Sequence, residues 1–461
     1  MADETPPGAG PKDVPEEVPI EPPTAAGRPI PPVPPAEPAM GAGRSEPAAP
    51  TRRRPAAPAP SFDLGGPSSR HGFHLASPEE IRGGRAADVY FHRGKAILDA
   101  EGENPPVVAE IRAGGLPDGW PWAVFAGLDE ALTLLEGHDI AVQALPEGSV
   151  FYPEEPVLTV AGRYLEFGVL ETALLGVLCQ ASGVATRAAR ARLAADGRPV
   201  YSFGARRMHP AISPMIERAA FLGGCDGVSA VKSAELIGVQ PVGTMAHALV
   251  LILGEERTLR GFDRVIDRRI PRVALIDTFQ DEKFGAIGAA RALGERLTAV
   301  RLDTPASRRG DFLTILREVR WELDALGYPD IKLFVSGGLD EKAIRTLNRY
   351  ADAYGVGTWI SNAPVVDFSL DLVEVSGTAR AKRGKLSGRK HLWGCDQCGA
   401  RGIAPATTRL GHCPNCGGRV RSLLRSVIAG GRLERRAREP IADVRAHALD
   451  EVDASAGPVV E

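Results

Sequence analysis

Residues 331–360 read IKLFVSGGLDEKAIRTLNRYADAYGVGTWI. An apolar run is followed by a glycine turn, a helix-like segment at 340–351, and a second apolar run that ends in another glycine turn. Near-continuous apolar strands that alternate with helices are typical of a parallel sheet covered on both faces. This stretch therefore predicts one strand–helix–strand unit of an α/β fold.

The same alternation extends from Val200 to Asp367. The strand-like runs, with helix-like segments between them, are PVYSFG, GVSAV, QPVGTM, RVALIDTF, LTAVRLDT, IKLFVSGGLD and AYGVGTWI. We therefore expect residues 197–370 to form an irregular or incomplete TIM-like (β/α) barrel, the catalytic domain. An open doubly wound sheet is the alternative.

The chain before the barrel has a different pattern. Residues 73–196 predict an N-terminal α+β, sandwich-like domain. Its expected elements are helices at 87–102, 128–136 and 166–196 and strands at 105–114, 122–127 and within 150–164. Residues 1–72 hold 19 of the 39 prolines and few large apolar groups, so they cannot bury enough surface to offset their ordering entropy. We expect a disordered tail there.

Four cysteines near the C-terminus form two C-x-x-C pairs, within CDQCGARGIAPATTRLGHCPNC at 395–416. Paired motifs of this kind are typical of Zn²⁺ sites. Four thiolates fill a tetrahedral shell and leave no open position, so the ion would be structural. The expected ligands are Cys395, Cys398, Cys413 and Cys416. We expect a return segment at 371–390, this zinc-binding lobe at 391–445 and a flexible tail at 446–461.

The composition is that of an ordinary globular protein, with 44% hydrophobic and 25% charged residues. The formal net charge of −3 lacks the basic excess of a duplex-binding protein. Cys179 and Cys225 lie in apolar surroundings and predict buried thiols, which suits a reducing compartment. The most apolar stretches are interrupted by polar residues or too short to span a bilayer, and no signal peptide is visible. We expect a cytoplasmic protein with no membrane or nucleic-acid partner.

Glycine-rich loops close the last two barrel units, at VSGGLD and GVGT. Chemistry gathers at the carboxyl ends of barrel strands, and glycines there let backbone N–H groups approach a phosphate. A pair of plain glycine turns is the alternative. The candidate phosphate-binding residues are Gly337, Gly338, Gly357 and Thr358.

Charged side chains end two other strands. RLD at 301–303 places Arg301 and Asp303 on one side of a strand end, where they can hold a diphosphate, its Mg²⁺ and a ribose hydroxyl. A structural ion pair is the alternative. Asp277 ends the strand-like run VALID and is a further candidate.

FGARR at 203–207 combines an aromatic ring with two arginines. Phe203 can stack on a planar ring, and Arg206 or Arg207 can pair with a carboxylate or a phosphate. A core phenylalanine with surface arginines is the alternative.

GTMAH at 243–247 precedes an apolar helix-like segment. Thr244 is a candidate N-cap, which would place His247 in the first helical turn, where an anion is favoured. A histidine there can accept a phosphoryl group. A satisfied, partly buried histidine is the alternative.

Taken together, these segments resemble the nicotinate phosphoribosyltransferase family. The resemblance runs from about Val89 to Arg438. It is carried by DVYFHRGKAIL, YSFGARRMHPAISPMIERAAFLGGCDGVS, GVQPVGTMAHALVL, ALIDTFQDE, AVRLDTPASRRGDF, VSGGLDE, and AYGVGTWISNAPVVDFSLDLVE followed by AKRGKLSGRK. The cysteine lobe resembles that of a branch, found in archaea and some bacteria, with a zinc-knuckle-like domain.

The resemblance implies an activity. Nicotinate and phosphoribosyl diphosphate would give nicotinate mononucleotide and diphosphate, in the salvage route of NAD biosynthesis. ATP hydrolysis would be coupled through a phosphohistidine, and Mg²⁺ would accompany phosphoribosyl diphosphate and ATP. The family assembles at least as dimers with a shared active site, so a homo-oligomer is implied.

The resemblance also implies roles for single residues. His247 would be phosphorylated, Thr244 would contact nicotinate, and Tyr90 would border the nicotinate pocket from the N-terminal domain. The other implied site residues are the stacking Phe203, the phosphate-binding Arg206, the substrate-binding Arg301, the ribose-side Asp303, the active-site carboxylate Asp277, and the phosphate-loop residues Gly337, Gly338, Gly357 and Thr358.

One motif departs from the family. Many members continue RLD with Ser-Gly-Asp, whereas this chain has Thr304 to Arg308, so the loop geometry and the roles of Arg308 and Arg309 stay open. Quinolinate or nicotinamide as the acceptor is the alternative on the same fold. A zinc-ribbon nucleic-acid-binding protein, prompted by arginines between 419 and 438, is a more distant alternative.

Overall fold

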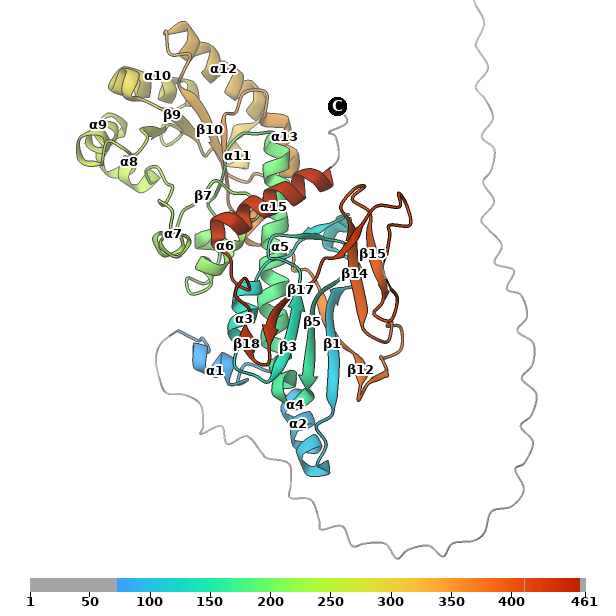
Figure 1. Ribbon diagram of the computed structural model, residues 1–461. Helices are drawn as coiled ribbons and strands as arrows, with labels where there is room; N and C mark the ends of the chain where they lie inside the picture. Colours follow the sequence, from blue (N-terminus) through green and yellow to red (C-terminus); the bar gives the residue numbers. More distant parts are fainter. Residues whose placement is uncertain (1–72, 410, 457–461) are drawn as a thin grey trace, which may run out of the picture. The chain divides into compact units, whose positions relative to one another are not determined.

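The computed structural model describes residues 73–409 and 411–456 (Figure 1). The tail expected at 1–72 lies outside the described residues, as do residues 457–461. The described chain builds a six-stranded sheet, a seven-stranded sheet, a three-stranded sheet and a two-stranded pair.

The stretch 331–360 folds as its pattern predicts. β10 (Lys332–Ser336) and β11 (Ala353–Val356) pair in parallel, and α13 (Glu341–Leu347) connects them. Both strands are buried along most of their length, which explains their near-continuous apolar sequence.

The complete parallel sheet has the strand order β7-β6-β11-β10-β9-β8. Its other strands are β6 (Val200–Ser202), β7 (Gly227–Val228), β8 (Val273–Leu275) and β9 (Ala299–Leu302). The edge strands β7 and β8 do not pair with each other, so the sheet is a curled half-barrel rather than a closed barrel. The irregular α/β barrel predicted from the sequence is confirmed in this open form.

The prediction of a strand at QPVGTM, 240–245, is wrong. These residues form an irregular coil, in which the Val242 backbone N donates to the Val228 carbonyl at 2.8 Å. Pro241 has no N–H to give to a strand ladder, and Gly243 offers no side chain to pack. The segment therefore adds no further strand beyond β7.

Aspartate caps start the helices that cover the sheet. α10 (Glu282–Leu293), α12 (Phe312–Ala325) and α13 begin after Asp281, Asp311 and Asp340, and each carboxylate accepts a backbone N–H of the first helical turn. Such caps stabilise a helix start by about 1 kcal/mol. They place these helix starts directly after the loops that leave the carboxyl ends of the strands.

The seven-stranded sheet is antiparallel and mixes distant parts of the chain. Its order is β13-β12-β1-β5-β3-β17-β18. The strands are β1 (Pro106–Ala113), β3 (Ile140–Ala144), β5 (Pro156–Arg163), β12 (Phe368–Val375), β13 (Thr378–Ala379), β17 (Arg425–Ala429) and β18 (Arg432–Leu433). β2 (Ala123–Val124) and β4 (Val150–Phe151) form the separate pair. The N-terminal sheet is thus completed by strands that follow the barrel, a pairing that local sequence cannot reveal.

The long helix α5 (Glu171–Ala195) packs between the sheets (Figure 1). It follows α4 (Tyr164–Phe167) and carries many small buried side chains, so neighbouring backbone comes close. A Cβ on Gly183 would lie 2.2 Å from the Pro364 carbonyl oxygen. By length and composition alone, segment 164–195 is apolar enough to cross a membrane, but half of its apolar window is buried inside the fold. It therefore has the packing of a core helix.

The cysteine lobe is a three-stranded sheet of β14 (Lys390–Cys395), β15 (Arg401–Pro405) and β16 (Val420–Ser422). Two ion pairs anchor it to the N-terminal sheet region. Arg401 donates two hydrogen bonds of 2.8 Å to Glu155, and Lys390 lies 2.7 Å from the fully buried Glu110.

The last helix, α15 (Ile441–Ala456), ties both regions together. Arg445 pairs with Asp226 beside the barrel, and His447 forms a hydrogen bond with Ser149 of the N-terminal region. Residues 446–456, where a flexible tail was expected, form the later turns of this helix. Ala448, in this part of the helix, is fully buried.

Candidate active site

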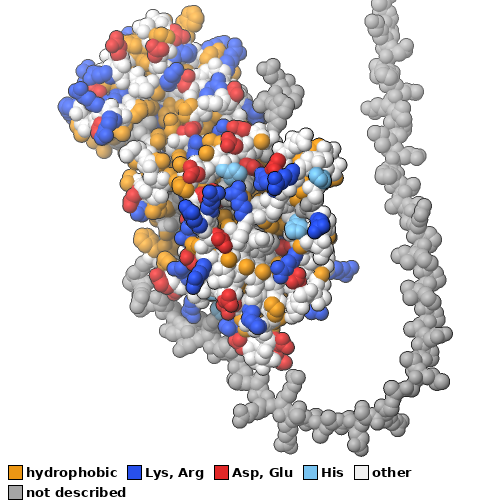
Figure 2. Space-filling view, viewed as in Figure 1, with side chains coloured by type: hydrophobic (Ala, Val, Ile, Leu, Met, Phe, Trp, Pro, Cys, Tyr) orange, Lys and Arg blue, Asp and Glu red, His pale blue; other side chains and the backbone are white. Residues whose placement is uncertain are grey.

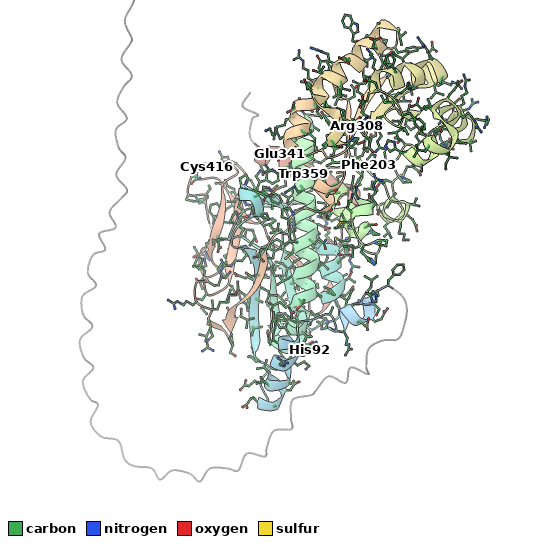
Figure 3. The ribbon with its side chains drawn as sticks, turned by 180° about the vertical axis from the view of Figure 1, so that it is seen from behind. His92, Phe203, Arg308, Glu341, Trp359 and Cys416 are labelled. Atoms are coloured by element: carbon green, nitrogen blue, oxygen red, sulfur yellow. The ribbon has the colours of Figure 1, made fainter. Side chains whose placement is uncertain are left out.

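A cavity of about 350 Å³ lies at the carboxyl edge of the parallel sheet. Figure 3 shows two of its lining residues, Phe203 and Trp359, in the region where the barrel meets α5. Eight residues predicted from the sequence line this cavity: Phe203, Arg206, Arg301, Asp303, Gly337, Gly338, Gly357 and Thr358. The carboxyl ends of the strands therefore bring together residues that are up to 155 positions apart in the chain.

Arg301 is the hub of the site. Its Nε donates to Ser336 Oγ at 2.9 Å, its Nη1 donates to Thr244 Oγ1 at 3.1 Å, and its Nη2 lies 3.2 Å from Asp303 Oδ2. The guanidinium carbon lies 5.2 Å from the centre of the Phe203 ring. Only 11% of the side chain is exposed, so these partners replace the water that a guanidinium normally binds.

Asp303 and Asp277 form a linked pair of carboxylates. Asp303 accepts from Ser336 Oγ at 2.7 Å, and its backbone N–H donates to Asp277 Oδ2 at 3.0 Å. The other Asp277 oxygen is buried and has no hydrogen-bond partner among the described residues. Burial raises the pKa of Asp277 above its usual value, although the nearby His247 opposes that shift. Asp277 therefore holds a proton more readily than an exposed aspartate.

His247 faces the same carboxylates. It is the first residue of α8 (His247–Leu253); its Nδ1 lies 3.0 Å from Thr278 Oγ1 and its Nε2 lies 3.6 Å from Asp303 Oδ2. The expectation that Thr244 caps this helix is wrong, because the N-cap is Ala246 and makes no side-chain hydrogen bond. The Thr244 hydroxyl accepts from Arg301 instead.

The first glycine loop needs glycine for steric reasons. Gly337 and Gly338 have φ angles of 88° and 63°, in the left-handed region that side chains disfavour. A Cβ on Gly337 would also lie 3.1 Å from the Asp303 carbonyl oxygen. Gly357 immediately precedes the short helix α14 (Thr358–Ser361). Both loops therefore line the cavity with glycines, which place no side chain in it.

Tyr90 is not brought to this cavity within one chain. It lies on α2 (Val89–Glu101), which Figure 1 shows far from β9 and β10. Figure 3 likewise separates His92, on the same helix, from Phe203. The Tyr90 side chain is 59% exposed, and its ring centre lies 4.3 Å from that of Phe91.

A second polar cluster lies near α2 and comprises Asp88, Glu171, Asp371, Lys382 and Lys385. The buried Asp371 lies 2.7 Å from the Lys382 ammonium and 3.0 Å from that of Lys385. Burial, together with the charges of Asp371 and Asp88, raises the pKa of Glu171 to about 7, although Lys382 opposes the shift. Asp88 is only two positions before Tyr90, so this cluster and Tyr90 form one surface.

Comparison with known proteins places this arrangement in a family. The models "Quinolinate phosphoribosyl transferase, N-terminal domain" and "C-terminal domain" match residues 88–182 and 184–371. Nicotinate phosphoribosyltransferase pncB1 of Mycobacterium tuberculosis is 30% identical over 327 residues, which cover 62% of this chain and 71% of that protein. The chain belongs to the nicotinate phosphoribosyltransferase family.

Further similar proteins match over different lengths. Nicotinate phosphoribosyltransferase pncB2 of M. tuberculosis is 34% identical over 281 residues, which cover 58% of this chain and 59% of that protein. A crystal structure named nicotinate-nucleotide pyrophosphorylase, from Pyrococcus furiosus, is 49% identical with a TM-score of 0.81, and the match covers 83% of this chain and 98% of that chain. Human nicotinic acid phosphoribosyltransferase, at 21% identity and a TM-score of 0.65, shares the fold.

Three residues of this site were absent from the predicted set. Ser336, the last residue of β10, bridges Arg301 and Asp303, and Thr278 holds His247. Both follow apolar runs that end barrel strands, which is the signal that could have identified them. Trp359 lines the cavity but carries no local sequence signal of its own.

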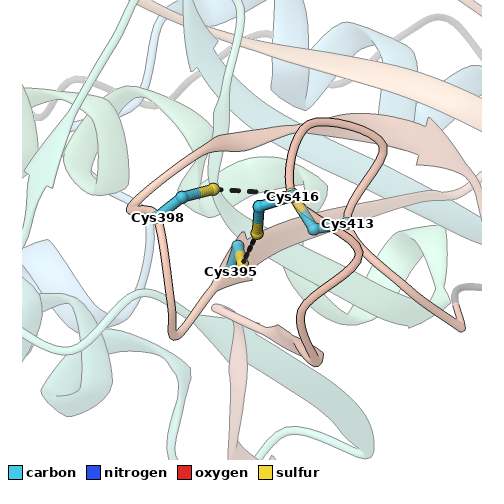
Figure 4. A group of neighbouring side chains, drawn as sticks. All are labelled: Cys395, Cys398, Cys413 and Cys416. Atoms are coloured by element: carbon cyan, nitrogen blue, oxygen red, sulfur yellow. Dashed lines mark hydrogen bonds between the residues drawn. The ribbon is translucent and has the colours of Figure 1, made fainter.

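The four cysteines of the paired motifs come together as predicted (Figure 4). Their sulfur atoms all lie within 4.8 Å of one another, with 3.5 Å between Cys395 and Cys416 and 3.6 Å between Cys398 and Cys413. A tetrahedral Zn²⁺ with bonds of about 2.3 Å requires sulfurs roughly 3.8 Å apart, so the group fits this ion. The lobe places this cysteine group away from the cavity, as Cys416 and Phe203 show in Figure 3, which suits a structural role.

We expect Cys395→Ser to lose bound zinc and to lower the melting temperature by about 5 °C or more, because a structural zinc site contributes folding energy directly. Turnover per folded molecule should be retained. Metal content, calorimetry and activity measure these three effects. Cys179→Ser, at a half-buried cysteine outside the group, is the control. A Cys395→Ser protein that stays folded and zinc-loaded but is inactive would contradict the structural role.

The raised pKa of Glu171 predicts a pH-dependent stability. Between about pH 4.5 and 7 the unfolded carboxyl is ionised while the folded one holds its proton, so the free energy of unfolding falls as pH rises through this window. Glu171→Gln removes that dependence. The variant should match the wild type near pH 4 and exceed its melting temperature above pH 7. Equal melting temperatures of the two proteins at pH 8 would refute the assignment.

Proposed function

We propose that this chain is a nicotinate phosphoribosyltransferase of NAD salvage. It would transfer the phosphoribosyl group from phosphoribosyl diphosphate to the ring nitrogen of nicotinate and release diphosphate. The observation that carries the proposal is the Arg301 hub, which holds an aromatic ring, a carboxylate and a glycine-rich strand end around one cavity. A cytoplasmic location remains a prediction.

The cavity offers separate surfaces for the two substrates. Gly337–Gly338 and Gly357 carry no side chains that would keep a phosphate from the backbone, and Arg206 adds a cation. Phe203 offers a stacking surface for the pyridine ring, and Arg301 offers the positive charge that the nicotinate carboxylate needs. These roles agree with those implied by the sequence resemblance.

The chemistry needs charge stabilisation on both sides of the breaking bond. Positive charge develops on the ribose carbon and negative charge on the departing diphosphate. Asp303 would support the sugar side, while arginines and backbone N–H groups would bind the leaving group. Mg²⁺ would arrive with the diphosphate, and the carboxylates of Asp303 and Asp277 are oxygen ligands of the kind that it prefers.

His247 would couple ATP to this transfer. Its 41% exposed imidazole can take the γ-phosphoryl group of ATP, with ADP as the leaving group, and later lose it to water. The new phosphate would add negative charge beside Asp303. It would therefore also affect Arg301, the ion-pair partner of Asp303. Phosphorylation would then change substrate affinity by rearranging the hub.

Quinolinate is the second candidate acceptor. It is favoured by the descriptions of the two matching domain models. Quinolinate carries one carboxylate more than nicotinate, and Arg206, Arg207 and Arg301 all line the cavity. Nicotinate is preferred because the M. tuberculosis relatives are named nicotinate phosphoribosyltransferases. The name of the P. furiosus structure refers to nicotinate nucleotide, which is the product from either acceptor, and so favours neither.

The nucleic-acid alternative finds little support on the surface. Figure 2 shows Lys and Arg side chains interspersed with Asp and Glu over the described part of the face in view. Several arginines after the cysteines are paired, as Arg421 with Asp396 and Arg438 with Asp129. Such pairs leave less positive charge for a phosphate backbone.

A homodimer would complete the site. Tyr90 and the second polar cluster lie at one end of the chain, and the Arg301 cavity lies at another. Exposed apolar side chains adjoin both: Val89 and Ile97 on α2, and Leu251, Ile252, Phe279 and Phe284 near His247. A two-fold dimer that packs these surfaces together would place Tyr90 of one subunit at the cavity of the other.

The first test is an assay with nicotinate and with quinolinate, each with and without ATP. We expect nicotinate mononucleotide from nicotinate and phosphoribosyl diphosphate, with ATP raising the apparent affinity about 5–150-fold, as coupled ligands typically do. Product from quinolinate but not from nicotinate, with no response to ATP, would favour quinolinate as the acceptor.

His247→Ala should abolish the ATP stimulation and keep the basal, ATP-independent turnover. The imidazole accepts the phosphoryl group in this proposal but does not touch the bond that breaks in the transfer. Phosphate release from ATP and nucleotide formation are measured together. His209→Ala, at another exposed histidine, is the control. ATP stimulation that survives in His247→Ala would refute the phosphohistidine.

Co-expression of Tyr90→Ala with Arg301→Ala tests the shared site. A mixed dimer has one site with both lesions and one intact site, so a statistical mixture should recover about a quarter of wild-type activity. The mixture of Arg301→Ala with Asp303→Asn should recover none, because both lesions affect the same half-site. No recovery in the first mixture would place Tyr90 outside the site.

A further inference from the structure

Two arginines one turn apart on α5, Arg187 and Arg190, contact the helices that follow the two phosphate loops. Both lie outside the active-site cavity and line a neighbouring cavity of about 500 Å³. The two cavities share Trp359 and Asp340 as walls. Figure 3 shows Trp359 and Glu341 together beside α5.

Arg187 holds the loop that contains Gly357. Its guanidinium carbon lies 4.5 Å from the centre of the Trp359 ring, and its Nη1 is 3.4 Å from the Trp359 carbonyl oxygen. Trp359 directly follows Thr358, a phosphate-loop residue. A shift of the Trp359 backbone therefore moves the backbone that faces the cavity.

Arg190 holds the other loop in the same way. Its Nε donates to Glu341 Oε2 at 2.9 Å. Glu341 is the first residue of α13, which begins directly after the Gly337–Gly338 loop and its Asp340 cap. Only 24% of the Arg190 side chain and 23% of the Glu341 side chain are exposed, so water competes weakly for this ion pair.

The far side of Arg187 is fixed to the N-terminal region. Its guanidinium carbon lies 5.7 Å from the Trp120 ring, and its Nη2 donates to Asp118 at 2.8 Å. Trp120 is buried, and Asp118 has a left-handed φ of 53°, an unusual backbone conformation that aims its carboxylate at Arg187. Arg187 thus lies near two indole rings and is only 15% exposed.

We propose that Arg187 and Arg190 are positioning residues for phosphoribosyl diphosphate. From one rigid helix they fix the distance between the two loops that would bind its phosphate groups. This inference rests on the proposed function. Neither arginine touches the ligand, and their effect is transmitted through Trp359 and Glu341. Because a misplacement of about 1 Å in a preorganised site is enough to weaken binding or catalysis strongly, loosening either contact has a measurable effect.

The test measures binding of Mg²⁺–phosphoribosyl diphosphate by calorimetry, together with steady-state kinetics. We expect Arg187→Met to weaken that binding about tenfold and to raise KM for phosphoribosyl diphosphate by a similar factor. KM for nicotinate and kcat should stay within about twofold of the wild-type values. Arg187→Lys should recover only part of the affinity, since an ammonium keeps the charge but not the planar group near the two indoles.

Arg192→Met is the matched control. Arg192 lies on the same helix and forms a close ion pair with Asp453, at 2.6 Å, but it contacts neither phosphate loop. It should leave the affinity for phosphoribosyl diphosphate unchanged even if the melting temperature falls.

Two results would overturn the inference. One is Arg187→Met with unchanged affinity for phosphoribosyl diphosphate, and the other is a parallel loss in both KM values like that of a globally destabilised protein. A wild-type chain that does not bind phosphoribosyl diphosphate would overturn the proposed function and this inference together. Binding of phosphoribosyl diphosphate without turnover of nicotinate would leave the positioning role supported and the acceptor wrong.

Discussion

The site depends on one buried cation that must be fully paired. Arg301 is almost enclosed, so each partner of its guanidinium has to be in place before the strands can close around it. Its partners come from three parts of the chain: Ser336 at the end of β10, Asp303 after β9 and Thr244 in the coil before α8. Satisfying this one group therefore fixes the relative positions of the Phe203 ring, the Asp303 carboxylate and the first glycine loop.

The open form of the barrel follows from the need to satisfy backbone hydrogen bonds. The coil at 240–246 would have had to donate N–H groups to a strand ladder, and Pro241 has none. As coil, the segment instead lets Thr244 reach Arg301 and lets α8 begin at His247. The irregular coil thus brings Thr244 and His247 of GTMAH close to Arg301 and Asp303.

The second polar cluster gathers charged groups of both signs around one buried carboxylate. Lys382 and Lys385 both pair with Asp371, and burial together with the charges of Asp371 and Asp88 raises the pKa of Glu171 to about 7. Asp118 and Trp120 connect the N-terminal region, through Arg187, to the glycine loop at Gly357. The long helix α5 carries that connection as a rigid element between the sheets.

The sequence alone determined the alternating strands and helices, the strand-end residues from Phe203 to Thr358 and the four cysteine ligands, because each depends on short-range spacing and on the rule that polar residues end buried strands. Only the tertiary structure decided that β12 and β17 complete the N-terminal sheet, that QPVGTM is coil, that Ser336 and Thr278 bind Arg301, Asp303 and His247, and that Tyr90 lies away from the cavity. Those outcomes depend on which distant segments pair and which buried polar groups must be satisfied. Local periodicity carries no information about either, because the free energy of pairing and burial arises only once the chain has brought those segments together.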